Sequence, residues 1–353
     1  MKIILPLNQS IVTTIPSHAN FLSIALTSEK GVDWLCNYYV NIYVKFNEQA
    51  WIESCKANFI DWGTLDRNYT NIVKSYFLPR YMIDNLFDFL VKALSNNYYI
   101  NLRLDEYYLP CCSFYQKQHS YHNTLITGID LETNVILLSD FYSYKIYQTY
   151  EVNFDNVYNA YENVSDDLIP KSPDYQFFRT EVQLLTLNDS YYKFSLNHLV
   201  QLLIDYKESK DSTGRFFNSS YIFESFDKKI TTTYIYGLNA INEIARLFCE
   251  KKLGIQNLHL LYDRYKAMVF RIKYLQNKFK VDLSLELIDY QRLEHDALIM
   301  RNLCLKYLVK GDVFTATKIR DGYNKISKNE QGILAKFIDK LQMFNDLHKE
   351  ITG

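Results

Sequence analysis

The stretch from Tyr107 to Asp140 reads YYLPCCSFYQKQHSYHNTLITGIDLETNVILLSD. Its second half predicts two antiparallel strands joined by a short turn, because residues 122–129 alternate and are rich in β-branched side chains, and residues 135–139 are almost wholly apolar. His122 opens the first strand and Asp140 follows the second. Antiparallel pairing sets the start of one strand beside the end of the next, so we expect the two side chains to lie within hydrogen-bond reach.

A histidine oriented by a carboxylate is two-thirds of a nucleophilic triad. His122 would take a proton from the nucleophile, and Asp140 would hold the imidazole in the tautomer that can accept it. The same spacing also fits a structural histidine and an aspartate that merely ends a strand. The residues alone leave both interpretations open.

The segment resembles the papain-like cysteine-peptidase fold. The likeness rests on the H-x-x-H element from His119 to His122, on Gly128 near the end of the strand, and on Asp140 at the end of the next strand. In particular it is similar to the family of the butirosin biosynthesis protein H, acyltransferases related to bacteriocin-processing peptidases. The resemblance implies an α+β fold, with a papain-like N-terminal domain (a helix packed on an antiparallel sheet) and a helical C-terminal domain.

The resemblance also implies an activity. It predicts an acyltransferase of natural-product biosynthesis that moves an acyl group from a carrier-protein thioester to a small amine, through a Cys-His-Asp type of site and without a cofactor. An acyl carrier protein and an amine acceptor are the expected partners. Two alternatives stay open: a non-catalytic papain-fold binding or scaffold protein of a biosynthetic pathway, and a cysteine peptidase.

A papain-like nucleophile lies at the N-terminus of a helix, where the helix dipole and free N–H groups stabilise a thiolate. The sequence predicts such a helix at residues 16–24, with Ser17 as its N-cap. The resemblance places the nucleophilic cysteine at the position of Ala19, and no cysteine precedes Cys36.

Three explanations for Ala19 compete: an engineered replacement of cysteine by alanine, a natural loss of the thiol, or the use of Cys36 as an alternative nucleophile. Cys36 falls inside the next predicted helix, which begins near Asp33, so its thiolate would gain little from the dipole. A small buried hydrophobic residue is the other interpretation of Cys36.

Gln9 and His18 are candidate donors for an oxyanion hole near the helix start, although turn and cap roles explain both residues equally well. Cys111 and Cys112 precede His119 and His122 and suggest a metal cluster, but adjacent cysteines chelate poorly. The sequence therefore predicts no metal site.

At 353 residues the chain is long enough for two domains. We expect a papain-like domain over residues 1–168 and a mainly helical domain over 169–353, which would serve as a lid or a carrier-protein dock. The proline-containing stretch 166–174 is the predicted boundary. Helical periodicity is clearest over residues 234–249 and 258–279, and it also predicts helices over 196–206, 283–309 and 312–344.

The formal net charge of −1 gives no electrostatic case for nucleic acid or for an anionic membrane. No apolar run reaches the roughly 20 residues of a membrane span. The six cysteines form no C-x-x-C pair, which predicts reduced thiols in a cytoplasmic protein.

Overall fold

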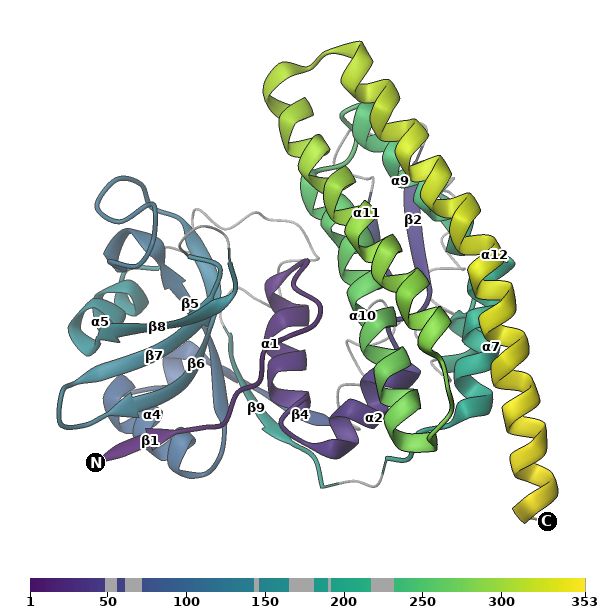
Figure 1. Ribbon diagram of the computed structural model, residues 1–353. Helices are drawn as coiled ribbons and strands as arrows, with labels where there is room; N and C mark the ends of the chain where they lie inside the picture. The colour runs from purple at the N-terminus through teal and green to yellow at the C-terminus, as the bar shows by residue number, and fades with distance from the viewer. Residues whose placement is uncertain are drawn as a thin grey trace. The chain divides into compact units, whose positions relative to one another are not determined.

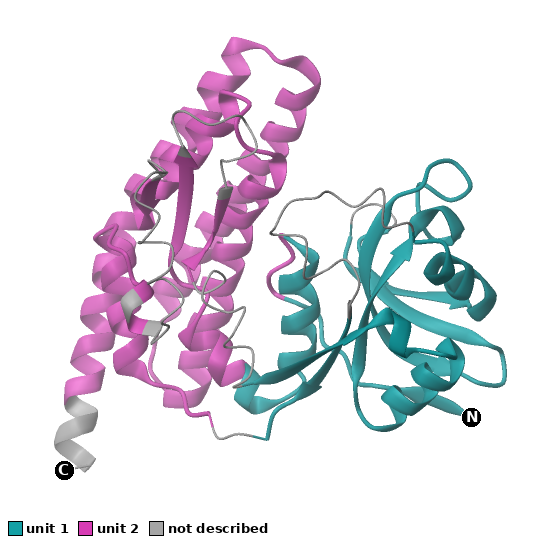
Figure 2. Cartoon of the chain, turned by 180° about the vertical axis from the view of Figure 1, so that it is seen from behind, with its two compact units in different colours: residues 1–10, 15–31, 69–191 teal, residues 11–14, 32–68, 192–353 magenta. Residues whose placement is uncertain are grey.

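A computed structural model describes residues 1–47, 56–60, 72–142, 146–164, 181–189, 192–216 and 232–352. They form an α+β fold with antiparallel sheets, and the chain divides into two compact units (Figure 1, Figure 2). Unit 1 comprises residues 1–10, 15–31 and 69–191, and unit 2 comprises residues 11–14, 32–68 and 192–353.

The predicted domain boundary after residue 168 differs from this division. The strand β9 (Glu181–Leu187) pairs with β4 (Val73–Pro79) and β5 (Tyr99–Asp105) in the sheet of unit 1, so that sheet continues beyond residue 168. Residues 32–68 belong to unit 2 although they precede most of unit 1. Strand pairing between distant segments decides which residues belong to each unit. Local composition does not reveal this pairing. The stretch 166–174 lies outside the described residues.

The sheet of unit 1 has the strand order β4-β9-β5-β6-β7-β8, and β1 (Lys2–Ile4) pairs with the C-terminal end of β6. The predicted hairpin is present as β6 (Tyr121–Asp130) and β7 (Val135–Asp140), each slightly longer than the pattern indicated. The next strand is β8 (Gln148–Asn153). The register shifts at a bulge between Ile126 and Gly128, so side chains on either side of this point follow separate alternations.

One face of this sheet is covered by two helices, α4 (Leu86–Ser95) and α5 (Phe154–Glu162), whose rings Phe87 and Phe154 pack together. Where β1 joins the sheet, Ile129 and Ile136 are directly paired and fully buried, whereas Ile4 points the other way and is 55% exposed. Because α4 contacts β1 and β6 there, it covers the buried face. Alternation along β7 puts Asp140 on the face of Ile136.

The opposite face carries α1 (Pro16–Ala25). Ile100 of β5 pairs with Ile126 on the Asp140 face, so its neighbour Tyr99 points to the opposite face. The Tyr99 hydroxyl donates to the carbonyl of Pro6. Two residues further on, the N–H of Asn8 donates to the carbonyl of Ser23 in α1 at 3.0 Å. In Figure 1 the strands of the sheet separate α1 from α5.

The start of α1 differs from the prediction in its cap. Ile15 is the N-cap and makes no side-chain cap bond, and Pro16 is the first helical residue rather than Ser17 the cap. Proline suits that position because its backbone angle is already helical and its missing N–H would have had no partner within the helix.

Unit 2 is largely helical, but it also holds a three-stranded sheet in the order β10-β2-β3, contributed partly by residues 42–59. The helix predicted from residue 234 begins at Gly237, and the residues before it form β10 instead. None of the described helices is long and apolar enough to cross a membrane. The bounds are α2 (Glu29–Asn37, divided between the units), β2 (Ile42–Asn47), β3 (Lys56–Phe59), α7 (Leu196–Lys207), β10 (Thr232–Tyr236), α9 (Gly237–Cys249), α10 (Ile255–Phe279), α11 (Ser284–Lys310) and α12 (Val313–Thr352).

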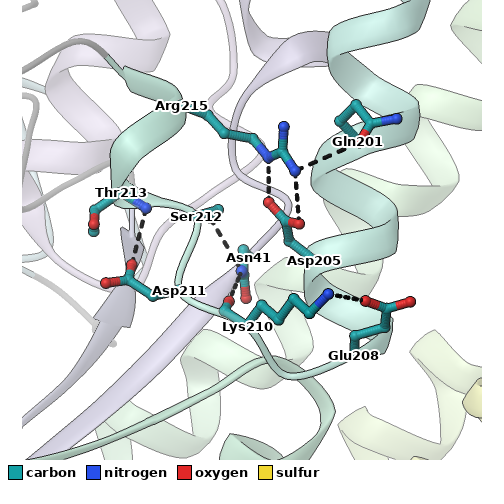
Figure 3. A network of polar contacts seen from close by, with 9 residues as sticks. All are labelled: Asn41, Gln201, Asp205, Glu208, Lys210, Asp211, Ser212, Thr213 and Arg215. Carbon is teal, nitrogen blue, oxygen red and sulfur yellow. Dashed lines mark hydrogen bonds and ion pairs between the residues drawn. The ribbon is translucent and has the colours of Figure 1, made fainter.

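A polar network fastens the loop after α7 to its surroundings (Figure 3). The guanidinium of Arg215 donates two hydrogen bonds to the carboxylate of Asp205, and the one from Nη2 to Oδ1 measures 2.9 Å. The amide of Asn41 donates to the Lys210 carbonyl and to the Ser212 hydroxyl, both at 3.1 Å. These contacts hold residues 210–215 against Asn41 and against Asp205 of α7.

Candidate functional site

The predicted hydrogen bond between His122 and Asp140 is present. Nδ1 of His122, near the start of β6, lies 2.8 Å from Oδ2 of Asp140, the last residue of β7. The Asp140 side chain is 1% exposed and that of His122 is 37% exposed. The carboxylate is therefore enclosed while part of the imidazole reaches solvent, which is the arrangement of a base and its orienting group.

Two further contacts hold the Asp140 carboxylate in place. The hydroxyl of Thr124 donates to Oδ2 at 2.9 Å, and the N–H of Phe141 donates to Oδ1 at 2.7 Å. The Tyr142 hydroxyl in turn contacts that of Thr124. Sequence reasoning missed Thr124, although its position two residues after His122 on the same strand face was a usable signal.

Burial of His122 opposes its charged form. The hydrogen bond and the negative charge of Asp140, with a smaller contribution from Glu106, outweigh that effect and raise the pKa of His122 above 6.5. Burial also raises the pKa of Glu106 itself. Glu106 follows the end of β5 and was not a sequence candidate, because nothing local distinguishes it from a surface carboxylate.

We expect Asp140→Asn to lower the pKa of His122, because the variant removes the charge that raises it while burial remains. A pKa raised on folding stabilises the protein fully below the unfolded value of 6.5, and this contribution is lost as the pH rises through the folded pKa. Titration of the imidazole signals by NMR measures the His122 pKa in the unchanged protein and in Asp140→Asn. An unchanged His122 pKa in the variant would show that Asp140 does not control it.

A second histidine–aspartate pair lies nearby in sequence. Nδ1 of His119 is 2.6 Å from Oδ2 of the fully buried Asp105, whose other oxygen accepts the N–H groups of Tyr107 and Ser120. The His119 ring stacks on Tyr107 with centroids 4.4 Å apart. Asp105 pairs with Tyr121 and not with His122, so the two histidine–aspartate pairs belong to opposite strand faces.

Within the described residues no group of three or more His, Cys, Asp and Glu side chains is arranged to hold a metal ion. Cys111 and Cys112, the two described thiols of unit 1, lie in the loop before His119, with Cys111 half-buried and Cys112 buried. A hydrogen bond with Cys111 and burial both raise the pKa of Cys112, so its thiol stays protonated at neutral pH.

Position 19 lies on the other side of the sheet from the dyad. Ala19 is fully buried in α1, and its N–H donates to the Ile15 carbonyl at 3.2 Å, so this group is not free to act as an oxyanion donor. His122 and Asp140 share the face covered by α4 and α5, whereas α1 is attached to the opposite face. The sequence-based grouping of Ala19 with the dyad therefore does not follow from the strand register.

The two oxyanion candidates, His18 and Gln9, lie in α1 and in the segment attached to it. His18 is fully buried. Asn8, the neighbour of Gln9, binds the carbonyls of Ser23 and Leu26 at the C-terminal end of the helix, and Gln9 is exposed. Gln9 thus follows a residue anchored at the end of α1 away from the predicted nucleophile position.

Cys36 belongs to unit 2 and is fully buried. Burial raises the pKa of its thiol to about 12, and the positive charge of Arg271 offsets this only in part. Arg271 donates instead to the carbonyls of Cys36 and Leu35 at 2.9 and 3.4 Å, at the C-terminal end of α2. These features favour the interpretation of Cys36 as a buried hydrophobic residue.

No protein-family model matches the chain, and no curated protein matches it. The resemblance to the family of the butirosin biosynthesis protein H therefore rests on the residues around His122 and Asp140.

Proposed function

We propose that this protein is an acyltransferase that moves an acyl group from a carrier-protein thioester to a small amine, with His122 as its general base. The observation that supports the proposal is the 2.8 Å contact of His122 with a buried, doubly anchored Asp140. This contact directs the Nδ1 proton to the carboxylate and leaves Nε2 to accept a proton.

The proposed transfer needs no thiol at position 19. Nε2 of His122 takes a proton as the amine nitrogen attacks the thioester carbonyl, and Asp140 stabilises the imidazolium. The tetrahedral intermediate then expels the carrier thiolate, which receives the proton back from the imidazolium. General-base catalysis of this kind contributes about 100- to 10,000-fold to a rate, and the natural-product setting of the proposal comes from the resemblance alone.

A binding or scaffold protein is the second candidate. It is favoured by one observation, the fully buried alanine at the position where the resembling family has its nucleophile. In that case the dyad would hold a ligand or the sheet without turnover.

The two candidates separate in a direct assay. The full chain is incubated with an acyl-pantetheine thioester, as a substitute for the carrier protein, and a panel of primary amines. We expect release of free thiol together with formation of the matching amide by mass spectrometry, at a rate above the protein-free reaction. Thioester and amine recovered unchanged across the panel would contradict the acyltransferase and leave the binding protein.

The position of α1 makes a further prediction about Ala19→Cys. Because the sheet separates α1 from the His122 face, we expect acylation of the new thiol by the same thioester to be slow and equal in Ala19→Cys and in Ala19→Cys/His122→Ala. Intact-protein mass spectrometry follows the acyl adduct. Ala25→Cys, at the other end of α1, is the matched control for thiol accessibility. Rapid acylation that depends on His122 would instead support a covalent Cys-His-Asp mechanism.

A further inference from the structure

The turn between α11 and α12 lies at the upper end of the helical hairpin in Figure 1. Large apolar side chains on both sides of this turn are exposed. Leu305, Leu308 and Val309 have the i, i+3, i+4 spacing of one helix face, and Val313 and Phe314 open the next helix. Their exposed fractions are 41%, 57%, 87%, 79% and 68%. We call these five residues the apolar tip.

Positive charge surrounds the apolar tip. The turn between α9 and α10 lies against it, because the Tyr307 hydroxyl donates to the Cys249 carbonyl at 3.0 Å and the Cys249 thiol lies 3.6 Å from the Ala316 carbonyl. Residues 250–252 and 305–320 contain six lysines and arginines against two acidic residues, a net charge of +4 in a chain of net charge −1. The cations are Lys251, Lys252, Lys306, Lys310, Lys318 and Arg320, and all six are exposed.

Both acidic residues are already counted in this net charge, and each is engaged by a neighbouring group. Asp312 accepts the N–H and the hydroxyl of Thr315 at 2.7 and 2.8 Å, as the cap of α12. Glu250 is already shared between Lys252 and Arg246. The Lys318 ammonium stands 4.1 Å from the Phe314 ring centroid, so a cation and an apolar group are presented together.

We propose that the apolar tip docks on an anionic membrane surface. Aliphatic and phenyl side chains at the projecting end of a helix pair can enter the boundary between headgroups and acyl chains, and flexible lysines beside them reach the lipid phosphates. Each basic residue near an anionic leaflet adds to the attraction, which the +4 cluster concentrates at one site. This peripheral attachment requires no membrane-spanning helix.

Vesicle co-sedimentation of the full chain tests the proposal. We expect binding to phosphatidylcholine vesicles that contain phosphatidylserine, little binding to phosphatidylcholine alone, and loss of binding as salt rises from about 0.1 M to about 1 M, where the screening length falls from about 10 to about 3 Å. The double variant Val309→Ser/Val313→Ser should weaken binding at least about tenfold, since it removes two of the side chains that would be buried.

The matched control is Leu285→Ser, which removes a side chain that is 72% exposed at the other end of α11. It should bind like the unchanged protein. Both sites are exposed, so we expect folding to be unaffected, which circular dichroism checks. No binding to anionic vesicles, or equal binding by the tip variant, would overturn the proposal. Self-association of the free protein that the tip variant abolishes would also overturn it, by identifying a second copy as the occupant.

Discussion

Replacing His122 by alanine should reduce the rate of amide formation by about 100- to 10,000-fold, the usual contribution of a general base. The reason is geometric. Asp140 is buried and accepts from Thr124 and Phe141, so its position does not depend on the histidine. The variant therefore removes the proposed base and leaves its orienting carboxylate in place. The initial rate of amide formation with a saturating acyl-pantetheine thioester is the measurement.

The chain offers a matched control in His119. It too is part-exposed, and its Nδ1 contacts a buried aspartate at 2.6 Å, but its pair belongs to the other strand face. We expect His119→Ala to leave the rate unchanged. Equal losses in both variants would indicate that the segment as a whole supports folding, and an unchanged rate in His122→Ala would remove His122 from the mechanism.

The second large effect concerns the core of unit 2. We expect Glu330→Ala to lower the free energy of unfolding by about 3–5 kcal/mol, the cost of breaking a buried ion pair by removing one partner. Glu330 Oε1 lies 2.6 Å from Arg264 Nη1, and Oε2 accepts the hydroxyls of Tyr206 and Tyr265 at 3.0 and 2.8 Å. All of these side chains are fully buried, so the variant would leave a buried cation without its carboxylate.

Urea unfolding followed by the helical circular-dichroism signal measures this loss. Lys252→Ala is the control, because its pair with Glu250 is part-exposed at 3.0 Å and should be worth less than about 1 kcal/mol. Replacing both partners, Arg264→Met with Glu330→Leu, should cost less than Glu330→Ala alone, since no charge is then left unpaired. A double variant at least as costly as Glu330→Ala alone would contradict this account.

The hairpin around Asp130 was predictable because its information is local. A short turn between two strands of known pattern sets the register, and the register brings His122 to Asp140. Thr124 follows from the same alternation. Asp105 and Glu106 were not found, because the turn that returns residues 119–120 to the end of β5 leaves no periodic pattern in the sequence.

The long helices of unit 2 were also predictable, with the exception of the residues before Gly237. Their apolar periodicity is strong over many turns, which fixes the type of element more firmly than its ends. The small sheet of β10, β2 and β3 was not, because its strands come from distant parts of the chain.

From its order of residues alone this chain specified a β-hairpin, a histidine–aspartate pair and a set of amphipathic helices, since each depends on neighbours within a few turns or across one short loop. The face of the sheet that α1 occupies, the burial of Glu330 against Arg264, and the approach of Lys251 and Lys252 to the apolar tip arose only in three dimensions. These features depend on contacts between segments far apart in sequence, such as the 66 residues that separate Arg264 from Glu330. An overall charge of −1 is an average over the chain, so it gave no indication of a local +4.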